Sequence, residues 1–71
     1  MKYLIAIVEN SIREPRIVNA HSSKAAIRSY NSIVYDEFCV GTIIGFYRNK
    51  RWNTIISIPK DTLNNILNKL E

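Results

Sequence analysis

The chain has 71 residues, of which 46% are hydrophobic and 23% charged. A chain this short forms one domain with a thin core, which excludes a large active-site cavity and a bound dinucleotide cofactor. The composition also excludes intrinsic disorder, and no apolar run approaches the ~18 residues of a membrane span. We therefore expect no membrane contact. The single cysteine allows no internal disulfide, which fits a reducing compartment, so we expect a cytoplasmic protein.

The net charge of +4 is unevenly distributed. Residues 1–37 hold five basic and four acidic side chains, whereas residues 38–71 hold five basic and two acidic ones. Much of the excess comes from Arg48, Lys50 and Arg51. Such a basic cluster attracts phosphate groups or an acidic protein surface.

The first predicted elements form a hairpin. Residues 2–9 are rich in β-favouring residues and apolar on both faces, which predicts a central strand. Residues 10–15 have the composition of a turn, and the short apolar segment 16–20 predicts a second strand.

A helix is predicted next, over residues 23–35. Ser22 or Ser23 can act as its N-cap, because a hydroxyl accepts a hydrogen bond from a free N–H of the first turn. We expect the adjacent acids Asp36 and Glu37 to form a solvated connection to the next strand. Helical spacing predicts that one buried stripe contains Ala26, Ile27, Tyr30, Ile33 and Val34.

The second half repeats this order. Strands are predicted over 38–48 and 51–58, joined by a two-residue turn at Asn49-Lys50. Pro59 ends the last strand, and Asp61 is the predicted N-cap of the final helix. That helix has its apolar residues at the i, i+3, i+4, i+7 positions, namely Leu63, Ile66, Leu67 and Leu70.

These elements predict an α+β fold in ββαββα order. The simplest packing is a four-stranded antiparallel sheet with both helices on one face. The whole chain, 1–71, is then a single domain. Its two ββα halves, about 1–36 and 37–71, are alike in architecture, although their residues do not repeat.

The second hairpin holds the candidate binding residues. With Asn49-Lys50 as the turn, Arg48 lies opposite Arg51. Together with Lys50 they place three positive charges at the tip of the hairpin, and like charges across a ladder repel each other. A bound anion would reduce this repulsion. Tyr47 opposes Trp52 on the other pleat face. The two rings can pack in the core and stabilise the sheet. If they stay exposed instead, they can join the neighbouring arginines as anchors of a protein interface, or stack on the bases of a nucleic acid. The predicted binding residues are Tyr47, Arg48, Lys50, Arg51 and Trp52, and the aromatic face also includes Ile43, Ile56 and Ile58.

No pattern indicates catalysis, a metal site or a cofactor. His21 is the only histidine and Cys39 the only cysteine, and nothing in their positions indicates a nucleophile activated by a base. Gly41 and Gly45 lack the pattern of a nucleotide-binding loop and indicate a bend or a close backbone approach. We therefore expect a protein that is not an enzyme.

Four short strands leave two sheet edges. An edge can pair with a second copy, which would make a homodimer, or with another protein. Lys2, Pro15 and Arg16 are the residues expected to protect an edge from such pairing.

One family resemblance accompanies these patterns. The opening Met1–Ile7 strand and the helix start from Ser22 to Ile27 resemble those of the HicB-type antitoxins, over about the first 35 residues. The proline–glycine turn of that family, between the strands and the helix, is absent here, so no functional residue is carried over.

The sequence leaves two functions open. We expect a non-enzymatic binding module that inhibits or regulates a protein partner by docking on it. The size is common among proteins encoded by a phage or mobile element, and the many Asn and Ile residues indicate an A+T-rich coding sequence. The alternative is a small basic nucleic-acid-binding protein, transcriptional or antitoxin-like, which would show a steep salt dependence of binding.

Overall fold

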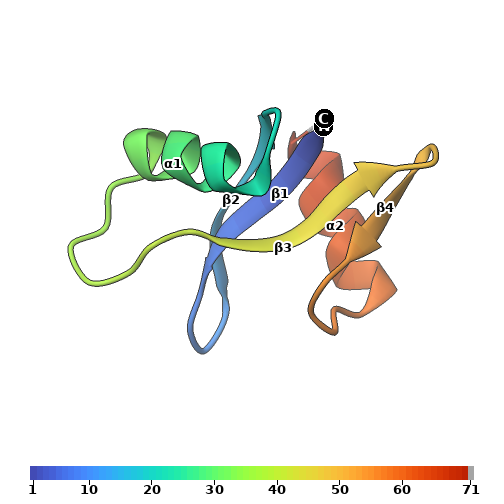
Figure 1. The fold of residues 1–71 in the computed structure, drawn as a ribbon. Helices are drawn as coiled ribbons and strands as arrows, with labels where there is room; N and C mark the ends of the chain where they lie inside the picture. Colours follow the sequence, from blue (N-terminus) through green and yellow to red (C-terminus); the bar gives the residue numbers. More distant parts are fainter. Residues whose placement is uncertain (71) are drawn as a thin grey trace.

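The computed structural model describes residues 1–70 and confirms the predicted ββαββα order. The strands β1 (Lys2–Val8), β2 (Ile12–Asn19), β3 (Thr42–Arg48) and β4 (Arg51–Thr54) form one antiparallel sheet in the order β2-β1-β3-β4. The helices are α1 (Ser23–Ile33) and α2 (Lys60–Leu70) (Figure 1). The central position of β1 agrees with its two apolar faces.

The two helices cover opposite faces of the sheet, so the prediction that both lie on one face was wrong (Figure 1). Alternate residues of β1 belong to different apolar clusters. Ile5 and Ile7 pack with Tyr30 of α1, whereas Leu4 and Ala6 pack with Leu67 of α2. A strand that is apolar on both faces needs a helix on each side to remove both faces from water. The second cluster is completed by partly buried residues, including Ile12, Ile17, Trp52, Ile56, Ile58, Leu63, Ile66 and Leu70.

The turn expected over residues 10–15 is mostly strand. β2 begins at Ile12, and the register between β1 and β2 shifts between Ile5 and Ile7. Glu14, with a φ of 52°, and Pro15 form the bulge there. An edge strand tolerates proline at a bulge because no ladder hydrogen bond is lost there. The buried Tyr30 hydroxyl donates to the Glu14 carbonyl oxygen at 2.7 Å, which ties α1 to this bulge.

Both strands of the second hairpin are shorter than predicted. β3 begins at Thr42 rather than residue 38, and β4 ends at Thr54 rather than residue 58. The register between β1 and β3 shifts where Leu4 pairs with Gly45 and Ile5 pairs with Ile43. This bulge places Ile43 in the cluster under α1, away from the face of Trp52 on which it was expected.

The helices begin close to the predicted positions. The Ser22 hydroxyl accepts from the Ala25 N–H at 3.1 Å, which confirms it as the N-cap of α1. α2 begins one residue before Asp61, which lies in the first turn and is not the cap. There the Pro59 carbonyl oxygen accepts from the Leu63 N–H at 3.0 Å. Within residues 1–70, neither helix is long and apolar enough to span a membrane.

Candidate functional site

The β3–β4 hairpin has the predicted turn and register. Asn49 and Lys50 have φ angles of 56° and 63°, as a two-residue turn with positive φ at both positions requires. Arg48 pairs with Arg51, and Tyr47 pairs with Trp52. The predicted binding residues are therefore brought together at one end of the sheet.

The tip of this hairpin concentrates positive charge. Arg48, Lys50 and Arg51 are all exposed, and none of them makes an ion pair within residues 1–70. Two arginines directly across a ladder repel each other. Lys50 adds a second cost, because a left-handed conformation is strained for any residue with a β-carbon and glycine would avoid it. Backbone strain and repulsion held together are typical of a functional site.

The aromatic pair behind the tip packs mainly within the protein. The Tyr47 and Trp52 rings meet edge to face, with centroids 5.5 Å apart. Trp52 is half-buried against the cluster under α2, so it contributes to the core as well as to the surface. Tyr47 stays 38% exposed, and the Lys2 ammonium lies 5.6 Å from its ring centroid. The pair therefore stabilises the hairpin, and both rings remain partly exposed.

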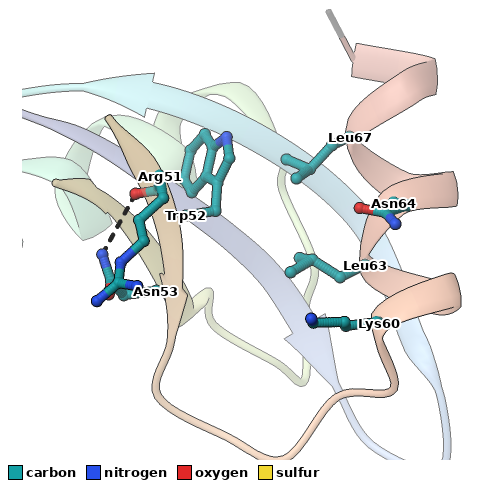
Figure 2. A pocket seen from close by; sticks show the side chains of 7 residues that line it. All are labelled: Arg51, Trp52, Asn53, Lys60, Leu63, Asn64 and Leu67. Atoms are coloured by element: carbon teal, nitrogen blue, oxygen red, sulfur yellow. Dashed lines mark hydrogen bonds between the residues drawn. The ribbon is translucent and has the colours of Figure 1, made fainter. Parts of the chain in front are cut away.

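A groove of about 590 Å³ separates β4 from α2. Figure 2 shows Trp52, Leu63 and Leu67 pointing toward one another across it, with Lys60 at its lower end. Arg51 and Asn53 lie on the other side of β4, away from α2 (Figure 2). No acid is among the residues that line the groove, which are Arg51, Trp52, Asn53, Lys60, Leu63, Asn64 and Leu67.

The outer edge of β4 is open. The Ile55 N–H donates to the Ile44 carbonyl oxygen at 2.9 Å, so the backbone of Ile55 faces β3. Because these groups alternate along a strand, the N–H and C=O of Trp52 and Thr54 point outward. No strand of the described chain pairs with this edge. The other edge strand, β2, is interrupted by the bulge at Glu14 and Pro15, a feature that disfavours pairing at a sheet edge.

Of the other residues expected to protect an edge, Arg16 lies on β2, but Lys2 lies on the central β1 and protects no edge. None of the three residues (Lys2, Pro15 and Arg16) lies on β4, the other edge strand.

A second surface, which the sequence did not predict, lies at the end of α1 and in the loop that leads to β3. We call residues 33–40 the apolar loop. Four of its large hydrophobic side chains are turned outward, with exposures of 66% for Ile33, 85% for Tyr35, 89% for Phe38 and 70% for Val40. The loop lies at the end of the molecule opposite the β3–β4 hairpin (Figure 1). Ile33 and Phe38 were expected in the helix stripe and in a strand, but neither is buried there.

Hydrogen bonds hold the apolar loop in one conformation. The Asp36 carboxylate accepts from the Phe38 and Cys39 N–H groups at 2.9 and 3.0 Å. These bonds, the Phe38 N–H first, lower the pKa of Asp36, and the nearby Arg13 guanidinium adds to the effect. At the far end, the Asn31 side chain accepts from the Gly41 N–H at 2.9 Å. The exposed side chains are thus presented by a hydrogen-bonded backbone.

The two residues considered for catalysis do not meet. His21 precedes the first residue of α1 and Cys39 follows its last, and the 11-residue helix between them is about 16 Å long. Burial, followed by the nearby Glu9 carboxylate, raises the pKa of the Cys39 thiol, whereas a nucleophilic cysteine needs a lowered one. Within residues 1–70, no group of three His, Cys, Asp or Glu side chains could hold a metal ion.

We compared the chain with known families, proteins and structures. No protein family, curated protein or solved structure matches this chain. The geometry of the hairpin, the groove and the apolar loop is therefore the basis for a functional argument.

Proposed function

We propose that this chain is a non-enzymatic binding module that inhibits or regulates a protein partner by docking on it. The observation that carries the proposal is the apolar loop. Monomeric proteins rarely expose several large hydrophobic side chains together, and such patches mark interaction sites. Here four of them project from eight consecutive residues, and backbone hydrogen bonds to the Asp36 and Asn31 side chains restrain the segment that presents them.

The charge of the apolar loop favours a protein over a nucleic acid. Asp36 and Glu37 are its only ionisable acids or bases apart from Tyr35 and Cys39, so the loop is acidic and would repel phosphate. The three cations of the hairpin tip favour the alternative, a nucleic-acid-binding protein. They lie at the other end of the molecule, however, and make a small basic spot rather than a continuous stripe (Figure 1).

Affinity isolation with matched variants tests the proposal. Tagged wild-type protein and the Tyr35→Ser/Phe38→Ser double variant are used to capture partners from a lysate of the native host, with and without nuclease. We expect one stoichiometric protein that survives nuclease with the wild type and is lost with the double variant. Ile55→Ser, which removes a 60%-exposed apolar side chain outside the apolar loop, should retain it.

Two results would overturn the proposal. One is recovery of nucleic acid, with every associated protein lost after nuclease and high salt, which would favour the alternative function. The other is equal capture by the wild type and the double variant. Tyr35 and Phe38 bury little surface within the fold, so the double variant should remain folded. A thermal melt of each variant checks this.

A further inference from the structure

We propose a second binding site at the β4 edge: it accepts, as a fifth strand, an extended protein segment in which apolar and acidic side chains alternate. The proposal names a different surface from the apolar loop and shares with the proposed function only the premise that the ligand is a protein. Three features of the β4 edge carry it, namely its free backbone groups, its apolar face and its basic face.

The backbone of β4 supplies the means of attachment. The N–H and C=O groups of Trp52 and Thr54 point away from β3 and have no strand to pair with among the described residues. An extended segment that adds to a sheet edge gains main-chain hydrogen bonds from such groups. On the other edge of the sheet, the bulge at Glu14 and Pro15 interrupts the ladder of β2.

The two faces beside that edge differ in chemistry, and the difference selects the ligand. On the α2 face, Trp52, Leu63 and Leu67 form the apolar side of the groove (Figure 2). On the other face lies the Arg51 side chain, paired across the ladder with Arg48 (Figure 2). Successive side chains of an added strand point to opposite faces. An apolar residue would therefore enter the groove, and the next, acidic residue would meet Arg51.

Charge also argues for a partner rather than a second copy of this chain. The strand β4 begins with an arginine and contains no acid, and Lys50 precedes it. Pairing two β4 edges would bring two basic hairpins together without a compensating charge. An acidic segment instead relieves the repulsion between Arg48 and Arg51.

A synthetic peptide tests this site directly. The probe is a seven-residue peptide with blocked ends in which glutamate and valine alternate, and it is compared with a peptide of the same composition that has all glutamates before all valines. Trp52 is the only tryptophan, so its fluorescence reports occupancy of the groove. Amide chemical shifts in NMR spectra then locate the contact on the chain.

We expect the alternating peptide to bind at least tenfold more tightly than the block peptide and to shift the amides of Trp52 and Thr54 most. Arg51→Glu should weaken binding about two- to thirtyfold, because it turns one exposed attraction into a repulsion. The matched control Lys24→Glu reverses an exposed cation on α1 and should leave binding unchanged. Phe38→Ser should also bind normally, which separates this site from the apolar loop.

Each of three results would overturn the proposal. Equal binding of the alternating and block peptides would show that no strand is added. Amide shifts that avoid Trp52 and Thr54 would place the peptide elsewhere. If the same amides shift as the protein is concentrated without peptide, a second copy occupies the edge instead.

Discussion

Replacing Arg51 by glutamate should make the protein more stable while it weakens binding at the β4 edge. Arg51 lies directly across the ladder from Arg48, both side chains are exposed, and neither has an acidic partner within residues 1–70. Arg51→Glu replaces this repulsion with a cross-strand ion pair. Residues at a binding site often reduce the stability of a protein, because they are retained for binding rather than for folding.

The size of the gain follows from cross-strand pair energies. An opposite-charge pair contributes roughly 0.2–1 kcal/mol, and a like-charge pair is unfavourable. If the two effects are similar in size, the exchange is worth about 0.4–2 kcal/mol, and exposure to solvent places it in the lower half of that range. For a domain of this length, each kcal/mol raises Tm by about 4–8 °C. A gain of about 0.4–1 kcal/mol therefore raises Tm by about 2–8 °C.

Thermal unfolding followed by circular dichroism at low salt measures this shift. Arg51→Gln serves as the control, because it removes the repulsion without creating an ion pair and should lie between the wild type and Arg51→Glu. In 1 M salt the gain should largely vanish, since charges on exposed side chains are then screened within about 3 Å. An unchanged or lower Tm for Arg51→Glu at low salt would refute the view that the tip cations reduce stability.

Three further predictions concern the backbone and the apolar loop. Gly41→Ala should lower the free energy of unfolding by about 1–3 kcal/mol in urea titrations, because its β-carbon would lie 2.3 Å from Cδ1 of the buried Tyr30; an unchanged midpoint would contradict this packing. Lys50→Gly should raise the free energy of unfolding by about 1 kcal/mol in the same titration by removing left-handed strain, and a loss of stability would contradict the turn geometry. The folded pKa of Asp36 is lowered, so its stabilising effect is present above the unfolded value and is lost as pH falls through the folded value. Hydrogen exchange of the Phe38 amide, corrected for the intrinsic pH dependence, should therefore lose protection as pH falls through the lowered folded pKa of Asp36, and Asp36→Asn should lack this transition.

The sequence predicted the hairpin at the tip well because local chemistry determines it. Asn49-Lys50 accepts the positive φ angles of a two-residue turn, and the turn then fixes which residues face each other across the ladder. The same reasoning fails beyond a bulge. The shift between β1 and β3 sends Ile43 to the other face, and no turn residue signals it.

The sequence analysis missed two features, namely the placement of the helices on opposite faces of the sheet and the exposed apolar loop. The reasons differ. A helical stripe shows which side of a helix is buried but not which face of the sheet it covers. The two apolar faces of β1 did indicate that the helices lie on opposite sides of the sheet, since each apolar face must be covered by a helix to be removed from water. In the apolar loop, Phe38 and Val40 have the composition of a strand, yet the hydrogen bonds of Asp36 turn the backbone away from the sheet. The one available signal was an aspartate two residues before Phe38, a spacing that favours a local turn.

The central claim is that the apolar loop docks on a protein, and the dissociation constant of Phe38→Ser for the captured partner tests it most directly. Phe38 is 89% exposed in the free protein, and burying a phenylalanine side chain contributes about 1.5–3 kcal/mol. Isothermal titration with the purified partner should therefore show binding weakened about 10- to 150-fold, with the Tm of the variant unchanged. A dissociation constant equal to that of the wild type would contradict the account.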